Sequence, residues 1–320
     1  MLRHLARRAA LGVLVLWLVT SAVFVLLRIA PTPVERIVGG PRASAETLAL
    51  IRRNLGLDQP AIVQYGRFLR HTCTGDLGFS FVNGISVSGL IASRLPATLW
   101  LVGGAAVLWL AGGVAIGVLS AVRARGPLDR ASSVVVLIGL STPPFLLAMV
   151  LLDLCAGRLS RLTGVDLFAS GPYVPPWPDP AAFLQHMALP WFSLAFLMLA
   201  VYTRLTRGSL IDVLGEDYIR TARAKGLPER RVVWRHGLRS ALTPVMTQFG
   251  VEVGALIGST IVTEKVFGLQ GVGQLVQTAV VQGDTPVILG VTMVTALFVV
   301  VAALLVDLLY VVLDPRVRFA

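Results

Sequence analysis

The stretch Pro286–Val306, PVILGVTMVTALFVVVAALLV, contains no charged side chain. A helix needs about 20 apolar residues to cross the hydrocarbon core of a bilayer, and this stretch is long enough. The rest of the chain has the same character, since 55% of its 320 residues are hydrophobic, 14% are charged and the mean hydropathy is +0.78. Soluble domains carry about 25% charged residues. The composition therefore predicts an integral membrane protein.

Five further segments complete a predicted set of six membrane spans. They are Ala9–Leu27, Pro96–Val122, Ala131–Leu152, Met187–Thr203 and Ser240–Thr263. The last two are weaker, because one is short and the other contains Glu252. The predicted fold class is an all-α integral membrane protein with six transmembrane helices and a small extracytoplasmic subdomain between spans one and two.

Basic residues predict the orientation of these spans. With the N-terminus inside, the inner segments hold 17 of the 28 Lys and Arg residues, and cytoplasmic loops are enriched in both types. Both termini are therefore predicted to be cytoplasmic. No groove-reading motif accompanies the net charge of +11, so we expect no nucleic acid as a partner. The first apolar run lacks a small-residue cleavage site, which favours a retained span over a signal peptide.

The spans and loops divide the chain into a predicted series of parts. These are a first span (1–29), an extracytoplasmic subdomain (30–95), a five-span core (96–313) with an inner loop (204–241), and a cytoplasmic tail (314–320). In the subdomain, Ser44 as a cap and Gly56 as a stop predict one helix, and an amphipathic pattern predicts a second after it.

The third predicted span contains two adjacent prolines, Pro143 and Pro144, in the run STPPFLLAMVLL. Proline removes a backbone donor and clashes with the preceding turn, so the helix must break there. Such a break persists in a membrane only beside protein or a water-lined cavity. It has two possible meanings, a structural kink or the wall of a pathway, and Ser141 and Thr142 directly before it are candidates for that wall.

The inner loop carries a basic segment, EDYIRTARAKGLPERRVVWRHGLRSAL (216–242), whose pattern predicts helix, turn, helix. The signals of the first helix, from start to stop, are Gly215, Glu216, Asp217, Arg223, Lys225 and Gly226. They follow the preference for acids in the first turn, bases in the last turn and a left-handed glycine at the stop. Pro228 suits the first turn of the second helix. A rigid exposed element predicts a docking surface, and a basic anchor on anionic lipid headgroups is the alternative.

The same segment resembles a known family. Residues 220–226, RTARAKG, resemble the E-A-A-x-x-x-G loop of binding-protein-dependent ABC importer permeases, with Ala222 and Gly226 matched and Arg220 in place of the glutamate. The form DYIRTARAKGL resembles the oligopeptide, dipeptide and nickel permease subfamily. So do NLGLDQP, GDLGFS, RLPATLWL, STPPF, VTEKVFGLQGVGQL and LVDLLYVVLDPRVR, although a proline is more familiar before the glycine of GLQGVGQL. These stretches cover nearly the whole chain.

The resemblance implies a type I ABC importer permease in the bacterial inner (cytoplasmic) membrane. It implies a heterodimer with a second homologous permease, two ABC ATPase subunits or one fused ATPase, and an extracytoplasmic substrate-binding protein. It also implies an ATPase-coupling loop formed by Tyr218, Arg220, Thr221, Ala222, Ala224, Lys225 and Gly226. The chain has no G-x-x-x-x-G-K-[ST] motif, so ATP and Mg are expected on the partner subunits, with no cofactor, metal or catalytic residue in this chain.

The cargo that the resemblance implies is a di- or oligopeptide, with nickel or other metal chelates and glutathione as alternatives. In this subfamily selectivity resides largely in the binding protein, so the permease sequence leaves the cargo open.

Glu252 gives a second class of function, an ion-coupled secondary transporter, because carboxylates inside membranes relay protons. No internal repeat is apparent to support that class. No cluster of nucleophile and base indicates an enzyme. In an importer, Glu252 is about 200° around the helix from Gly250 and Gly254, which belong to a glycine face with Gly258 that permits close packing. The carboxylate then faces either the translocation path or a partner in the second permease.

Overall fold

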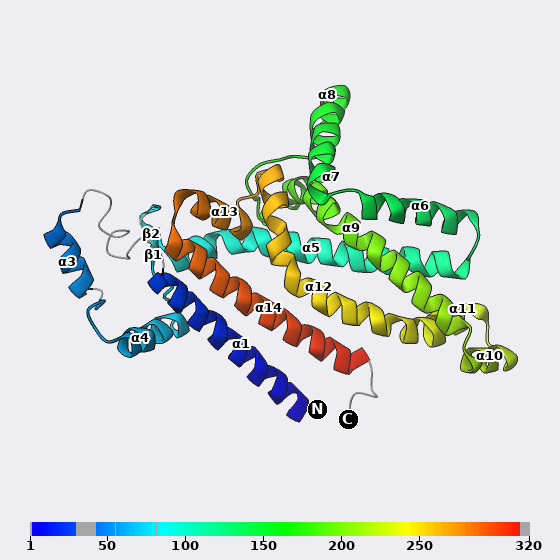
Figure 1. Cartoon of the computed structure of the whole chain (residues 1–320). Helices are drawn as coiled ribbons and strands as arrows, with labels where there is room; N and C mark the ends of the chain where they lie inside the picture. Colours follow the sequence, from blue (N-terminus) through cyan, green and yellow to red (C-terminus); the bar gives the residue numbers. More distant parts are fainter. Residues whose placement is uncertain (1, 30–42, 55, 81, 314–320) are drawn as a thin grey trace. The chain divides into compact units, whose positions relative to one another are not determined.

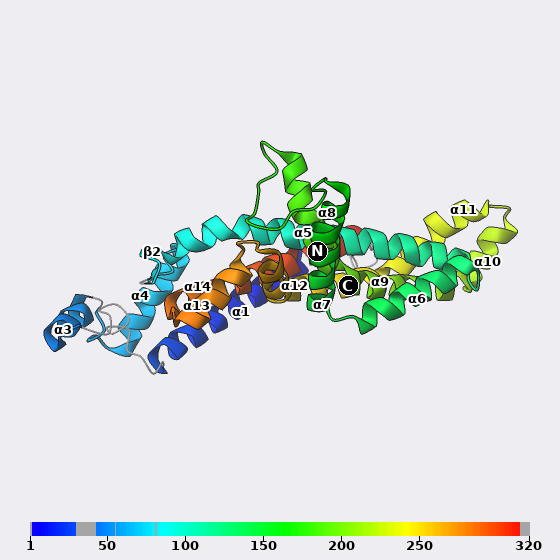
Figure 2. The same cartoon turned by 90° about the horizontal axis from the view of Figure 1, so that it is seen from above.

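The computed structural model describes residues 2–29, 43–54, 56–80 and 82–313 (Figures 1 and 2). The predicted tail at 314–320 lies outside these residues, as does the beginning of the predicted extracytoplasmic subdomain. The described residues are mostly helical, with one antiparallel two-stranded hairpin. They divide into two compact units, the described residues up to 95 with 275–300, and residues 96–274 with 301–313.

The first unit contains the N-terminal helix, the hairpin and the beginning of the last helix. Its elements are α1 (Leu2–Ile29), α3 (Ala45–Asn54), α4 (Ala61–Cys73), β1 (Phe79–Ser80), β2 (Ile85–Ser86), the first turns of α5 (Val87–Val122), most of α13 (Val272–Gln282) and the first part of α14 (Thr285–Leu313). In the hairpin Phe79 lies opposite Ser86. The Ser80 hydroxyl donates a buried hydrogen bond of 2.5 Å to Asp284, the residue before α14.

Helices α3 and α4 confirm the two helices predicted for the extracytoplasmic subdomain. The Ser44 hydroxyl accepts the backbone N–H of Thr47 (3.2 Å), as expected of a cap, and Gly56 has a φ of +67° after the helix. Helix α4 is fixed to α1 by a hydrogen bond of 2.6 Å between the hydroxyls of Tyr65 and Ser21. An apolar cluster around Val23 of α1 then joins α1 to α14.

The second unit is built around α9. Its elements are the rest of α5, α6 (Pro127–Ser141), α7 (Pro144–Leu151), η1 (Leu152–Leu159), α8 (Ser160–Thr163), α9 (Pro180–Leu214), α10 (Asp217–Ala224), α11 (Glu229–Arg231), η2 (Val232–Gly237), α12 (Leu238–Phe267), the start of α13 and the end of α14. The two η elements are π-helices. Helices α6, α7 and α12 pack against α9.

Glycines of α5 let this helix approach α9 closely. A Cβ at Gly113 would lie 2.6 Å from the Cβ of Tyr202, and one at Gly117 would lie 2.8 Å from the carbonyl oxygen of Thr203. Small residues allow such close helix packing in membranes. At Gly258, where the sequence also predicts close packing, an added Cβ would meet no atom within 4 Å. That part of the predicted glycine face of α12 is open in this chain.

The break predicted at Pro143 and Pro144 is confirmed and is sharper than a kink. Helix α6 ends at Ser141, Pro143 occupies the N-cap position of α7 and Pro144 is its first residue. The axes of 127–141 and 144–163 differ by 105°. Because neither proline can donate a backbone hydrogen bond, no helical ladder connects the two parts.

The described helices agree with the predicted spans in place but not always in length. Four helices are long and apolar enough to cross a membrane by themselves, and the number rises to six if the bent pairs 127–141 with 144–163 and 229–253 with 258–267 each form one span. The predicted fourth span, Met187–Thr203, is part of the longer helix α9. The count of six stays a prediction.

Candidate coupling helix and translocation elements

Helix α10 ends in the capped turn that the sequence predicts. Gly226 has a φ of +74°, in the left-handed region. Its N–H donates to the carbonyl of Arg223 (2.9 Å), and the N–H of Leu227 donates to the carbonyl of Ala222 (3.4 Å). These two bonds form a Schellman motif, in which a glycine beyond the helix satisfies its free carbonyl groups. The stop at Gly226 is confirmed.

One face of α10 is buried and the other is exposed. Ile219 and Ala222 pack with Val232 of η2 in a small apolar cluster that Leu214 and Leu227 extend. The exposed predicted contact residues are Tyr218, Arg220, Thr221, Ala224, Lys225 and Gly226. Ala222, predicted for the same contact, is instead 8% exposed, because it lies on the inward face of the helix with Ile219.

The segments on either side of α10 differ from the predicted pattern. Gly215 is the C-terminal cap of α9 and does not cap α10, whose N-cap residue is Glu216. Asp217 lies in the first turn, as predicted. Pro228 precedes α11, which continues through η2 into α12 without interruption. The predicted second helix of the loop is therefore the beginning of a helix that enters the fifth predicted span.

Side-chain hydrogen bonds fix α10 to its neighbours. Arg223 donates to both carboxylate oxygens of Glu229 (3.1 and 2.7 Å) and to the carbonyl of Leu214 (3.3 Å). The bond with Glu229 raises the pKa of the Arg223 guanidinium, which stays charged. The Tyr218 hydroxyl donates to Ser240 Oγ of α12 (3.1 Å). Helix α10 is thus a short, fixed element that projects where α9 and α12 meet (Figure 1).

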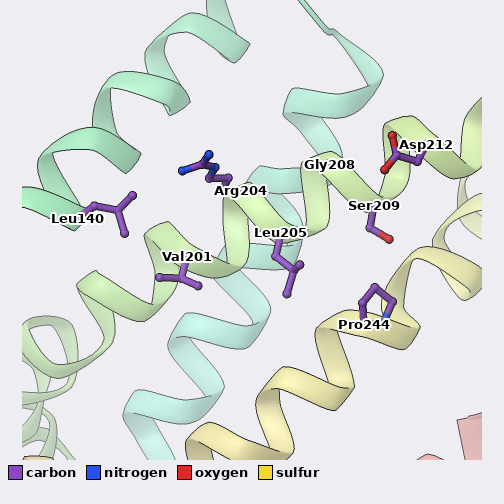
Figure 3. Close-up of a pocket in the computed structure, with 8 residues that line it drawn as sticks. All are labelled: Leu140, Val201, Arg204, Leu205, Gly208, Ser209, Asp212 and Pro244. Carbon is purple, nitrogen blue, oxygen red and sulfur yellow. The ribbon is translucent and has the colours of Figure 1, made fainter.

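A pocket of about 620 Å³ lies between three helices of the second unit (Figure 3). It is lined by Leu140 of α6, Pro244 of α12 and six residues of α9, which are Val201, Arg204, Leu205, Gly208, Ser209 and Asp212. Arg204 and Asp212 are exposed, and no ion pair involves either of them in the part of the chain that the structure describes. The pocket therefore presents one cationic and one anionic group on the same helix.

The predicted path residues do not line this pocket. The Thr142 hydroxyl donates to the carbonyl of Ile138 (2.7 Å) within the broken helix, while Ser141 is exposed beside Leu140. Glu252 of α12 is half-buried, and its Oε1 accepts a hydrogen bond from Gln248, one turn earlier on the same helix (2.8 Å). Ser141 and Thr142 are therefore adjacent at the end of α6, while Glu252 lies on α12.

Comparison with known proteins matches two family models to this chain. One, described as binding-protein-dependent transport system inner membrane component, covers residues 113–319. The other, the N-terminal part of the same kind of membrane component, covers residues 1–102. The chain belongs to this permease family. The permease is 38% identical, over the full length of both chains, to proteins named glutathione transport system permease protein GsiC from Salmonella paratyphi A and from Escherichia coli K12.

Membership confirms the predicted importer class. The permease is a membrane component of an ABC importer, a multi-pass protein of the inner membrane, and it is not the ATPase of the complex. A permease of this kind works with a partner permease, an ATPase and a binding protein. Its fold belongs to the type I importer permeases, as the sequence predicts.

An ion pair that sequence reasoning missed joins the first turn of α6 to α9. Asp129 is 5% exposed and accepts two hydrogen bonds from Arg207, of 2.6 Å from Nε and 2.9 Å from Nη2, and one from the backbone N–H of Arg125 (2.8 Å). A bidentate guanidinium contact fixes orientation as well as distance. The two residues of this ion pair are 78 positions apart in the sequence, so no local sequence pattern reveals their contact.

A second missed residue is Glu264, which is fully buried near the end of α12. Its carboxylate accepts hydrogen bonds from the Thr98 hydroxyl of α5 (2.7 Å) and the Gln274 N–H (2.8 Å), and also from the Thr260 hydroxyl and the Gly273 N–H. The Thr98 oxygen in turn accepts the N–H of Val272 (2.8 Å). Glu264 and Thr98 therefore satisfy the free N–H groups at the start of α13, where the helix dipole favours a negative charge.

This network accounts for two glycines in the stretch VTEKVFGLQGVGQL. A Cβ at Gly271 would overlap the Glu264 carboxylate, and a Cβ at Gly273 would lie 2.9 Å from the Cα of Ile261 and 3.0 Å from Glu264 Oε2. The loop can close over the carboxylate only because both positions lack a side chain. The sequence signal for this site was a glutamate followed by closely spaced glycines. This signal becomes informative only when the contact between the glycines and the Glu264 carboxylate is known.

Proposed function

We propose that the permease forms, with a second homologous permease, the path by which short peptides, glutathione among them, enter the cell. The proteins named glutathione transport permease are similar to it over their whole length, and glutathione is itself a small peptide. The path would be fed by an extracytoplasmic binding protein. Two ATPase subunits, or one fused ATPase, would bind ATP and Mg on the cytoplasmic side, where both termini lie.

Helix α10 is the observation that carries the coupling part of this proposal. It is short, capped at its end, tied to α9, α11 and α12, and exposed along one face. A coupling element must be stiff to transmit movement and exposed to receive a partner. The proposed ATPase contact is formed by the exposed residues Tyr218, Arg220, Thr221, Ala224, Lys225 and Gly226. Ala222 supports this contact from the buried face of α10.

The test of coupling is Gly226→Val in the assembled complex. A β-branched residue is strained at a φ of +74°, and because an added Cβ would meet no atom within 4 Å, the substitution acts through the backbone. We expect uptake of labelled peptide to fall at least about tenfold, with the ATPase dissociated or hydrolysing ATP without transport.

The matched control is Gly164→Val. Gly164 also has a positive φ (+69°), caps a helix and has open space around it, but it lies after α8. This variant should transport at a rate close to that of the unmodified protein. Normal transport by the Gly226→Val complex would remove α10 from the coupling role.

Orientation is tested by cysteine labelling in intact cells, after Cys73 and Cys155 have been replaced by serine. Cysteines at Ser44 and Gly171 should react with a membrane-impermeant reagent from outside, and one at Glu229 only after the cells are opened. Reaction of the Glu229 position from outside would reverse the proposed topology.

The cargo is tested with the binding protein and vesicles that contain the complete complex. Labelled glutathione, a labelled dipeptide and a labelled oligopeptide are offered on the side of the binding protein, and ATP is supplied on the side of the ATPase subunits. Nickel chelates are added as competitors of peptide uptake, and their own uptake is also measured. Uptake of peptides that nickel chelates do not inhibit supports the proposal. Uptake of a nickel chelate alone would replace peptides as the cargo, and uptake driven by a proton gradient without ATP would indicate a secondary transporter.

A further inference from the structure

The segment after α10 carries a basic surface that the coupling role leaves unused. Its residues are Arg230, Arg231, Trp234, Arg235 and Arg239, all of them exposed, and we call this set the α11–η2 patch. Trp234 is 56% exposed, a large fraction for a tryptophan. The patch belongs to the single continuous helix of α11, η2 and the start of α12.

The backbone places these residues along one side of the helix. In η2 the buried residues are Val232, Val233 and Gly237, and a Cβ at Gly237 would lie 3.2 Å from side chains of Leu210 and Leu214. The side facing α9 is thus fixed by close packing. Arg231, Arg235 and Arg239 are four residues apart, as are Arg230 and Trp234, and a π-helix with i→i+5 bonds keeps residues at this spacing on one face.

Within the part of the chain that the structure describes, the charges of the patch have no counterion. Glu229 is the only acidic residue between 229 and 251, and it is bound to Arg223. Over the residues that the structure describes, no ion pair involves any of the four arginines of the patch. Four guanidinium groups beside one another repel unless an anionic partner lies close.

The position of the patch indicates the kind of anionic partner that these arginines contact. Arg239 is the last charged residue before Glu252, so the apolar part of α12 begins directly after it. Trp234 lies five residues earlier, which at about 1.5 Å per residue is roughly 7 Å along the helix and close to the thickness of one headgroup layer. Tryptophan and arginine are enriched at this level of a membrane.

We propose that the α11–η2 patch binds anionic lipid headgroups of the inner leaflet and so anchors the base of the coupling helix to the membrane surface. The guanidinium groups contact the phosphates, and the Trp234 side chain extends from the aqueous side of the headgroup layer into that layer, toward the acyl chains. Helix α10 then contacts the ATPase with its own exposed face, while the adjoining segment contacts lipid. This inference needs α12 to cross the membrane and does not depend on the cargo.

The experiment measures quenching of Trp234 fluorescence by lipids brominated on their acyl chains. The complete complex is placed in phosphatidylcholine vesicles that contain the same mole fraction of brominated phosphatidylglycerol or brominated phosphatidylcholine. The signal of Trp234 is the difference between the unmodified complex and Trp234→Phe, since the chain has six tryptophans. We expect the anionic lipid to quench Trp234 at least about two-fold more strongly, and added salt to reduce this preference.

Charge variants separate lipid binding from other causes. The quadruple Gln variant combines Arg230→Gln, Arg231→Gln, Arg235→Gln and Arg239→Gln, and it should show equal quenching by the two lipids. The same four positions changed to Lys should keep the preference for the anionic lipid, because an ammonium group still attracts phosphate. If the quadruple Gln variant does not assemble, the pair Arg231→Gln and Arg235→Gln should lower the preference in part. Arg123→Gln with Arg130→Gln, at the exposed turn between α5 and α6, is the control and should change nothing.

Two results would overturn the proposal. One is equal quenching by both lipids in the unmodified complex, which would show that Trp234 meets bulk lipid without charge selection. The other is quenching that appears only after the ATPase subunits are removed, which would show that a protein covers the patch. Neither result bears on transport, so the proposed function stands or falls separately.

Discussion

Two carboxylates of the same helix, Glu252 and Glu264, have opposite surroundings. Glu264 is fully buried, and its hydrogen-bond donors come from α5, from α12 and from the first turn of α13. Glu252 is half-buried, and the hydrogen bond that the structure gives it comes from Gln248 of its own helix. They are twelve residues apart on α12, so their different roles arise from what surrounds the helix at each level.

The difference shows how the role of a carboxylate inside a membrane can be inferred from its hydrogen-bond donors. An ionised carboxylate loses its hydration there, and only donors or a second charge compensate the loss. Glu264 has a complete set of donors, so its charge is used inside the chain to hold a loop. Among the residues that the structure describes, Glu252 has one donor, Gln248, so its carboxylate keeps acceptor capacity for a group outside the chain. We infer that this is the translocation path, with a residue of the second permease as the alternative.

The largest effect is expected for Glu264→Gln. The amide keeps the volume but has one acceptor oxygen where the carboxylate has two, so its NH2 group must face either the Thr98 hydroxyl or the N–H groups of Gly273 and Gln274. A buried donor left without a partner costs about 1–3 kcal/mol, and in either orientation the amide brings two donors face to face. We expect a marked loss of folded protein and a lower midpoint of thermal unfolding in detergent, measured on the purified complex.

The same substitution at Glu252 is the control for this result. Glu252→Gln changes charge and hydrogen-bonding capacity identically on the same helix, so the effect of glutamine on helix formation cancels between the two variants. If Glu264→Gln unfolds at the same temperature as the unmodified complex, the buried network does not hold the loop and the comparison fails.

Local signals in the sequence predicted the features that neighbouring residues determine. The stop at Gly226, the break at Pro143 and the cap at Ser44 each depend on residues within one or two turns. Glu264 was missed because most of its donors lie at Thr98 and beyond the end of α12, and because the apolar window that defined the predicted span ended at residue 263.

Helix α10 shows the same limit on a smaller scale. Its exposed and buried faces follow from a helix period, but Ala222 was assigned to the exposed contact through its match to a family motif. Only the packing of Val232 against α10 shows that Ala222 points inward. In the same way, the Asp129–Arg207 pair joins residues on α6 and α9, and its existence depends on the packing of these two helices.

A smaller effect on stability but a clear effect on transport is expected for Glu252→Gln. Removing the charge leaves Gln248 able to hydrogen-bond to an amide, so the fold of the chain should be retained. If Glu252 faces the path, the complex assembles and its transport rate or cargo preference changes, most clearly for peptides with a free ammonium group. Poor assembly with the second permease would assign Glu252 to the subunit interface, and normal transport of every cargo would remove it from both roles.

The smallest effect is expected for Gln248→Ala, which removes the hydrogen bond to Glu252 while keeping its charge. A partly exposed hydrogen bond contributes about 0.5–1.5 kcal/mol, and alanine is the better helix former, so the two effects nearly cancel in the unfolding midpoint. Gln248 orients the carboxylate, so transport should change in the same direction as in Glu252→Gln but by less. The double variant should behave like Glu252→Gln alone, because neighbours that act through one contact are not additive. A loss of stability in Gln248→Ala as large as that of Glu264→Gln would mean that Glu252 also holds the fold, and the two carboxylates would then have the same role.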